Sequence, residues 1–168
     1  CIAINELPKL LLELKREDAY ESLLARVRDI VPKTNVAAKC LVELARRCAG
    51  RAQVELATQH FESALEEDPS TVDALDGLAA LHEERAIIER EQLRMPRAAI
   101  ESYRAAFQRK ASPELLDPLI ELYEHEELWD DLVQVLEERA GLAQAPAARA
   151  ALVSRAARVL YEKLHRAE

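Results

Sequence analysis

The chain of 168 residues is 49% apolar, contains only 3 glycines and carries a formal net charge of −8. This length and apolar content allow one compact domain with a continuous core. The scarcity of glycine argues against the tight turns of sheet proteins and against glycine-rich phosphate loops, whereas the abundant Ala, Leu, Glu and Arg are good helix formers. We therefore predict an all-α protein.

Charge and cysteine content limit the surroundings in which this chain works. The acidic balance makes attraction to phosphate backbones unfavourable, so we expect no nucleic acid partner. No apolar run approaches the roughly 18 to 20 residues that cross a bilayer, so we expect no membrane insertion. Cys40 and Cys48 would lie about 12 Å apart on one helix at ~1.5 Å per residue, too far for a disulfide. We read them as buried apolar residues of a cytoplasmic protein.

The first predicted unit, residues 1–34, has apolar residues at helical spacing in two groups. The groups are Ile4, Leu7 and Leu11, and then Tyr20, Leu24 and Val27 ahead of Pro32. Pro8 interrupts the first group. The apolar opening "CIAI" at Cys1, without a methionine, suggests a piece cut from a longer protein.

The second unit, residues 38–71, has the clearest pattern. Its first helix face carries Leu41, Leu44, Ala45 and Cys48, and its second carries Ala57, Phe61 and Ala64, with a turn around Gly50 between them and Pro69 at the end. Offsets of three, four and seven place each group on one side of a helix. Small residues recur where two helix axes approach closely, and large ones fill the space beside them. The pattern predicts an antiparallel helix pair.

The third unit, residues 72–112, repeats the pattern with a longer first helix. The two faces carry Leu75, Leu78, Ala79 and His82, and then Ala99, Tyr103 and Ala106. Ser70 and Asp73 have the spacing of a capping box at its start. Residues 86–93 add about two helical turns before Pro96 can begin the second helix.

The fourth unit, residues 113–146, and the terminal helix, residues 147–168, complete the series. The apolar positions are Leu116, Leu119, Ile120 and Tyr123, then Trp129, Leu132 and Leu136, and finally Val153, Ala156, Ala157 and Leu160. Pro118 should kink its helix, unless Asp117 restarts the helix as a cap. Trp129 is expected to pack between helices rather than to anchor a partner.

The units start at Ile4, Leu41, Leu75, Leu116 and Val153, at intervals of 37, 34, 41 and 37 residues. This period and the 41–69 pattern resemble the tetratricopeptide repeat, with Leu41 in place of the family's Trp and Cys48 in place of its Tyr. The 116–140 unit departs further, with Leu132 at a small position and Arg139 before Ala140. The resemblance implies a right-handed superhelix of stacked hairpins whose first helices line a concave groove.

In that family the groove is lined by the positions of each first helix that point away from the packing face. Here the stripe reads Ile2, Asn5, Lys9 and Leu12; Lys39, Val42, Arg46 and Ala49; Asp73, Asp76, Ala80 and Glu83; Glu114, Asp117, Glu121 and Glu124; and Ala151, Ser154, Arg158 and Tyr161. We expect its seven central carboxylates to bind a basic or amphipathic protein segment. The other interpretation is that these residues are ordinary solvated helix faces.

Other functions receive weaker support from the sequence. Catalytic motifs for nucleophilic, phosphate-loop or zinc chemistry are absent from the sequence, so we expect no enzyme and no cofactor. His82 and His125 lie beside carboxylates, but a metal site would need three or four converging ligands, and we predict none. A second candidate surface is Ile87, Ile88 and Leu93, which have no partner in a regular repeat. The rival role is a structural spacer that self-associates through the ends of the solenoid.

Overall fold

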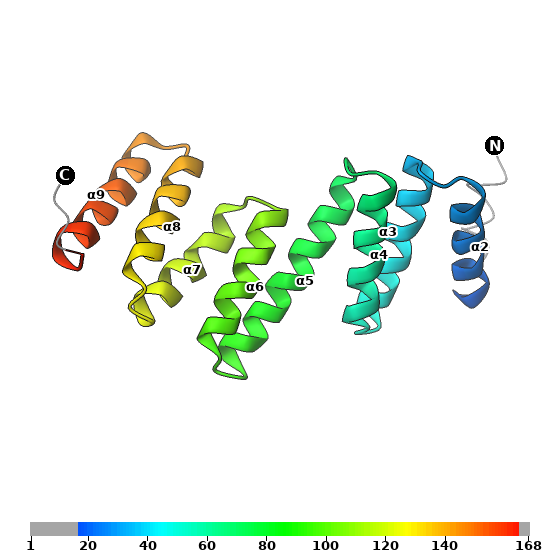
Figure 1. Cartoon of the computed structure of the whole chain (residues 1–168), viewed down its shortest axis with the longest axis horizontal. Helices are drawn as coiled ribbons and strands as arrows, with labels where there is room; N and C mark the ends of the chain where they lie inside the picture. The colour runs from blue at the N-terminus through cyan, green and yellow to red at the C-terminus, as the bar shows by residue number, and fades with distance from the viewer. Residues whose placement is uncertain (1–16, 165–168) are drawn as a thin grey trace. The chain divides into compact units, whose positions relative to one another are not determined.

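The computed structural model describes residues 17–164, and every regular element in that range is an α-helix (Figure 1). The helices are α2 (Glu17–Ile30), α3 (Asn35–Gly50), α4 (Val54–Glu67), α5 (Val72–Glu91), α6 (Pro96–Arg109), α7 (Pro113–His125), α8 (Trp129–Leu142) and α9 (Pro146–Glu162). The prediction of an all-α protein is confirmed for this part of the chain. The expectations for Ile4, Leu7, Pro8 and Leu11 lie outside it.

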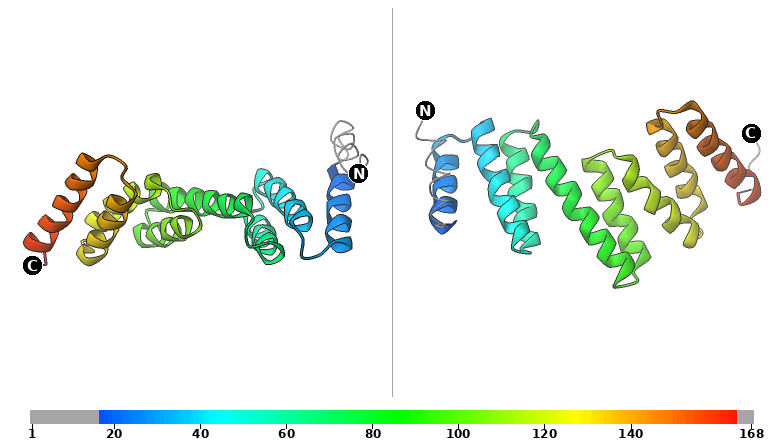
Figure 2. Two further views of the ribbon diagram at one scale, coloured as in Figure 1. Left: turned by 90° about the horizontal axis from the view of Figure 1, so that it is seen from above. Right: turned by 180° about the vertical axis from the view of Figure 1, so that it is seen from behind.

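The chain divides into two compact units, with the division at Leu78 inside α5. The first unit holds α2, α3, α4 and the start of α5, and the second holds the remainder of α5 and α6 to α9. Within the units, helices that follow one another in the chain lie side by side, as α3 and α4 or α8 and α9 do in all three views (Figure 2). The architecture is therefore a series of helical hairpins.

The second helices α4 and α6 both bury an aromatic ring between two alanines, at the same spacing. In α4 the fully buried residues are Ala57, Phe61 and Ala64, and in α6 the corresponding residues are Ala99, Tyr103 and Ala106. Each aromatic ring has an alanine one helical turn before and after it, so the backbone comes close to its neighbour on both sides of the ring. The prediction that these alanines lie on the buried face of their helices is confirmed.

Two hairpin turns also repeat the same backbone pattern 75 residues apart. The amide of Gln53 donates to the carbonyl of Cys48 at 2.9 Å, and that of Leu128 donates to the carbonyl of Tyr123 at 2.9 Å. The preceding residues, Ala52 and Glu127, both have a φ of 57°. The α3–α4 and α7–α8 hairpins therefore share one turn conformation. A non-glycine residue in this left-handed region costs free energy in both of them.

The extended first helix of the third unit is present: α5 runs for 20 residues, against 16 in α3 and 13 in α7. Its predicted capping box is wrong. The helix begins at Val72, so Thr71, whose carbonyl accepts from the Leu75 amide at 3.4 Å, stands at the N-cap, and the Ser70 hydroxyl donates to the Asp68 carboxylate at 2.6 Å. The N-cap is one residue later than the spacing predicted, and Ser70 belongs to the preceding turn.

Pro118 does not divide its helix. α7 is continuous from Pro113 to His125 with Pro118 inside it, and the prediction that Asp117 restarts the helix as a cap is wrong. Pro118 is the sixth residue of α7, so the amide that proline lacks would have bonded to Glu114 in the first turn. The flanking residues Leu116 and Leu119 are fully buried, and their packing holds the helix together across the proline.

The packing predictions for the cysteines and for Trp129 agree with the structure, whereas Val153 and Ala157, predicted on the packing face of the last helix, are exposed. Cys40 and Cys48 are buried free thiols. Trp129 is partly buried against the apolar core that α6, α7 and α8 share, and Lys163 lies 4.8 Å from its ring centroid. The indole therefore packs between helices, with a cation over its ring.

Candidate interaction surface

Four predicted carboxylates lie together on one side of α7, and we call this set the α7 acidic face: Glu114, Asp117, Glu121 and Glu124. Steps of three, four and three residues place them along one helix side, away from the buried leucines. The first three are exposed and Glu124 is half-buried. The sequence pattern therefore located a continuous acidic strip on a single helix.

Arginines from three other helices reach this face. Arg139 of α8 pairs with Asp117 at 2.8 Å, and Arg155 of α9 pairs with Glu124 at 2.5 Å. Arg90 of α5 lies 3.9 Å from Glu121. The α7 acidic face is thus a mixed surface in which three carboxylates already have a cationic neighbour. Sequence reasoning had considered the carboxylates without these arginines.

Arg139 reaches Asp117 because of its place in the repeat. It follows Leu136 by three residues, as Ala64 follows Phe61 in α4 and Ala106 follows Tyr103 in α6, and both of those alanines are fully buried. An arginine is too long for such a contact point, and its charge is costly to bury. The guanidinium instead turns outward to the exposed carboxylate of Asp117.

Glu114 has a local partner. It accepts a short hydrogen bond from the Ser112 hydroxyl, and this bond is the main cause that lowers the pKa of the Glu114 carboxyl. Glu83 of α5 is also exposed. Both carboxylates are therefore accessible to solvent.

The first unit carries the other predicted acidic residues, Asp73 and Asp76. Asp73 pairs with Arg46 of α3 at 2.8 Å, and both side chains are more than half exposed. Asp76 is exposed as well. Val42, predicted to lie on the solvent stripe of α3, is only 3% exposed, so its assignment to the groove is wrong. Its β-branched apolar side chain belongs to the core of this unit.

Exposed ion pairs of this kind contribute about 0–1 kcal/mol each. They hold side chains in place only weakly, so a cationic group from a partner can exchange with Arg90, Arg139 or Arg155. Such an exchange keeps the number of ion pairs constant. Net affinity must therefore come from the further contacts that a partner adds.

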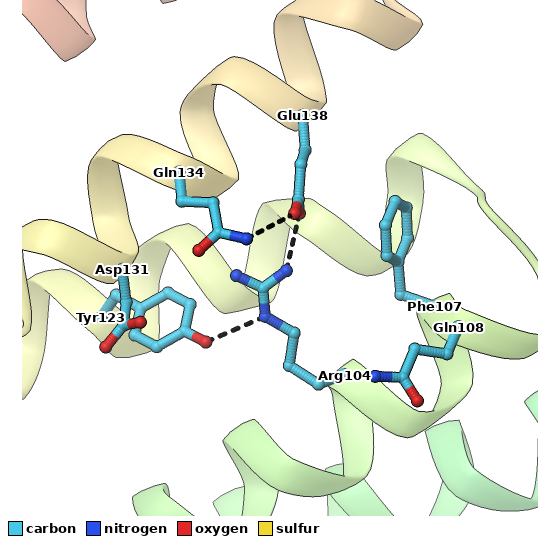
Figure 3. Close-up of a pocket in the computed structure, with 7 residues that line it drawn as sticks. All are labelled: Arg104, Phe107, Gln108, Tyr123, Asp131, Gln134 and Glu138. Atoms are coloured by element: carbon cyan, nitrogen blue, oxygen red, sulfur yellow. Dashed lines mark hydrogen bonds and ion pairs between the residues drawn. The ribbon is translucent and has the colours of Figure 1, made fainter.

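A pocket of about 530 Å³ lies on α6, α7 and α8 in the second unit, and we call it the α6–α8 pocket (Figure 3). Its lining residues are Arg104, Phe107, Gln108, Tyr123, Asp131, Gln134 and Glu138. At 100° per residue, Tyr123 lies on the side of α7 away from the acidic face. The two sites are therefore separate.

Arg104 lies at the centre of the hydrogen bonds in this pocket. Its Nε donates to the Tyr123 hydroxyl at 3.0 Å and its Nη1 to Glu138 at 2.6 Å, while Gln134 donates to the second oxygen of Glu138 at 3.1 Å (Figure 3). Burial alone would lower the pKa of Arg104, but the bonds with Tyr123 and Glu138 raise it overall. The guanidinium stays charged and fixed in position.

Sequence reasoning missed this pocket. Arg104 and Glu138 are separated by 34 residues, a distance close to the repeat period, and both fall on second helices. That shared register was the available signal, because residues one repeat apart come together when successive hairpins pack.

The second candidate surface and the two histidines lie at separate places in the fold. Ile87, Ile88 and Leu93 are exposed near the turn between α5 and α6, Leu93 by 57%. His125 contacts Glu126 at 3.2 Å, and His82 is half-buried. Within residues 17–164, no group of three or more His, Cys, Asp or Glu side chains is placed to hold a metal ion. In the same range no helix has the length and apolar character to span a bilayer.

Comparison with known proteins leaves the family unassigned. No family model matches the chain, and no curated protein matches it. The likeness to the tetratricopeptide repeat therefore remains a prediction that depends on the spacing and on the hairpins themselves.

Proposed function

We propose that this chain is a non-enzymatic interaction module, similar to tetratricopeptide repeats, that binds a basic or amphipathic protein segment. The carboxylates of the second unit, Glu83 and the α7 acidic face, form the core of the proposed binding surface. Asp73 and Asp76 of the first unit extend it if the hairpins stack as a superhelix. Free buried Cys40 and Cys48 favour a cytoplasmic setting.

The observation that carries this proposal is the set of ion pairs between first helices. Arg90 of α5 approaches Glu121 of α7, and Glu124 of α7 pairs with Arg155 of α9. Such contacts are consistent with first helices that turn their polar sides to one common face, as in a repeat protein with a binding groove. A common polar face of three helices supplies several sites at which a bound segment can exchange ion pairs.

The test uses a dye-labelled amphipathic helical peptide with arginine on its polar face, and measures binding by fluorescence anisotropy. We expect binding that weakens as salt is added, because exposed charges are screened beyond about 8–10 Å at physiological ionic strength. Reversal of Asp117 and Glu121 to Lys should abolish the binding. Helical content by circular dichroism should be unchanged.

The matched control reverses Glu101 and Glu137 to Lys on the exposed sides of α6 and α8 in the same unit. This double variant has the same net charge but leaves the α7 acidic face intact. Equal loss of binding in both double variants would show an unspecific charge effect. Unchanged affinity of the Asp117 and Glu121 variant at low salt would contradict the proposal.

A second candidate function is a spacer that stacks on a further copy or on further repeats. The exposure of an apolar residue of α9 favours it. Val153 of α9 stands 37 residues after Leu116 of α7, and it is 51% exposed where Leu116 is 0% exposed. A helix with the pattern of α4 or α6 would cover this position. Light scattering over a range of concentrations tests it: self-association that Val153→Glu removes would support the spacer, and a monomer throughout would reject self-association.

A further inference from the structure

The α6–α8 pocket has a surplus of hydrogen-bond acceptors on one wall. Asp131, Gln134 and Glu138 follow one another on α8 at steps of three and four residues, so they share one side of that helix. Glu138 is occupied by Arg104 and Gln134. The Gln134 carbonyl oxygen points away from Glu138, and Asp131 lies on that same side in the view (Figure 3).

The opposite wall is apolar and aromatic. Phe107 of α6 is partly buried against the shared core, and its ring stands across Arg104 from Tyr123 (Figure 3). Arg104 between the two walls is neutralised by Glu138 and held by Tyr123. The lining therefore combines an apolar ring, a net negative charge and acceptors that are not used within the pocket.

We propose that the α6–α8 pocket binds an arginine or lysine side chain of a protein partner. The aliphatic stem of that side chain would lie along Phe107, and its cationic end would bond to Asp131 and to the carbonyl oxygen of Gln134. Long basic side chains have this division between an apolar stem and a charged tip. The inference rests on the proposed function, since it assigns to the basic partner a second contact away from the α7 acidic face.

A cation fits this pocket better than an anion for a physical reason. The one cationic side chain among the lining residues, Arg104, already holds a carboxylate, so an anion would have to displace Glu138. Asp131, in contrast, is an exposed carboxylate with no cation among its pocket neighbours other than the occupied Arg104. A guanidinium or ammonium group would add an ion pair without breaking one.

The experiment uses two small probes, N-acetyl-arginine methylamide and the corresponding citrulline compound, with amide NMR shifts as the readout. Citrulline has nearly the same shape without the charge. We expect the arginine compound to bind in the millimolar range and to shift amides near Phe107, Asp131 and Gln134. The citrulline compound should bind at least tenfold more weakly.

Two variants at one helix end provide the control. Asp131→Asn should weaken the arginine compound by about tenfold, the usual order for losing a charged hydrogen bond. Asp130→Asn makes the same charge change in the same first turn of α8 but is not in the pocket lining, so it should retain affinity while reproducing any effect on the helix dipole. Phe107→Leu keeps an apolar side chain but removes the ring, and should weaken the binding of both probes.

The outcomes separate this inference from the proposed function. An absence of shifts with the arginine compound, equal shifts with citrulline, or stronger shifts with inorganic phosphate would overturn the pocket assignment. If the labelled helical peptide responds to the Asp117 and Glu121 reversal but not to Asp131→Asn, the proposed function holds and its second contact does not. If the arginine compound binds and the peptide does not, the pocket stands and the proposed function fails.

Discussion

The α3–α4 and α5–α6 hairpins carry matching second helices, with Phe61 and Tyr103 at positions 42 residues apart. The residues just before these rings differ in chemistry. In α4 it is His60, which is half-buried, and in α6 it is Ser102, which is buried and donates to Glu89 of α5 at 2.6 Å. The longer α5 brings a carboxylate, 6% exposed, into the hairpin interior. The extension of α5 therefore comes with a polar pair, Glu89 and Ser102, in the hairpin interior.

Removal of the Ser102 hydroxyl should have the largest effect on the free energy of unfolding. Burial raises the pKa of Glu89, but hydrogen bonds from Ser102 and Arg85 outweigh it, so the pKa is lowered overall. Ser102→Ala should cost about 1.5–3 kcal/mol at neutral pH, because a charged acceptor loses a buried donor. Urea unfolding measures it, with exposed Ser154→Ala of α9 as the control.

The pH dependence of that variant has a defined sign. A carboxyl group with a lowered folded pKa stabilises the fold above its unfolded pKa of about 4.3, and the contribution is lost as the pH falls through the folded value. The cost of Ser102→Ala should therefore shrink as the solution is acidified below pH 4. An equal cost at pH 7 and at pH 3 would show that the Glu89 charge is not involved.

The contact between Gly77 of α5 and the Phe61 ring of α4 should be sensitive to added volume. A Cβ at this position of α5 would overlap the Phe61 ring, whereas a Cβ at Gly141 of α8 would meet nothing within 4 Å. Gly77→Ala should destabilise the fold by about 1–2 kcal/mol, since overpacking exceeds the gain in helix propensity. Gly141→Ala should stabilise it by about 0.5–1 kcal/mol. In a Phe61→Leu background the sign for Gly77→Ala should reverse.

His60 should make the first unit sensitive to mild acid. Burial, and then the charge of Arg28, lower the pKa of this imidazole, while Glu21 opposes them. A histidine whose folded pKa is lowered binds its proton more readily in the unfolded chain, so stability falls as the pH drops through about 6.5. His60→Gln should remove this slope between pH 7 and pH 5.5. A slope that persists in the variant would assign it to another group.

The smallest effect is expected in the turns. Ala52 in the α3–α4 turn and Arg94 in the α5–α6 turn have φ angles of 57° and 52°. Glycine adopts this conformation without the clash of a Cβ, although it loses more backbone freedom on folding. Each change to glycine should therefore raise stability by about 0.5–1 kcal/mol. Thermal unfolding measures both, and a loss in either would show that the side chain contributes more than its strain.

The sequence was sufficient for features that depend on local spacing. The intervals among Ala57, Phe61 and Ala64 predicted a buried face, and the additional apolar turns after Ala86 predicted the longer α5. It was insufficient where partners lie one hairpin away. The bond between Arg155 and Glu124 spans 31 residues, and nothing in the pattern around either residue indicates the other.

The α7 acidic face could be predicted from local spacing, whereas the α6–α8 pocket could not. Periodicity alone placed the four carboxylates of α7 on one side. The pocket needed three helices to come together, and its lining is set by packing rather than by a local motif. The capping error at Ser70 has the same origin, because the turn around Asp68 and Ser70 places the helix start at Val72, and the spacing rule does not describe that turn.

The two buried thiols of α3 make this molecule its own reporter of unfolding. Burial raises the pKa of both Cys40 and Cys48, so they remain protonated and are shielded from electrophiles in the folded state. In a Cys1→Ser variant, a thiol-specific dye would react only when α3 opens transiently, and the labelling rate would then report how often that helix opens. Any ligand that stabilises the folded first unit should lower this labelling rate, even before the ligand is identified.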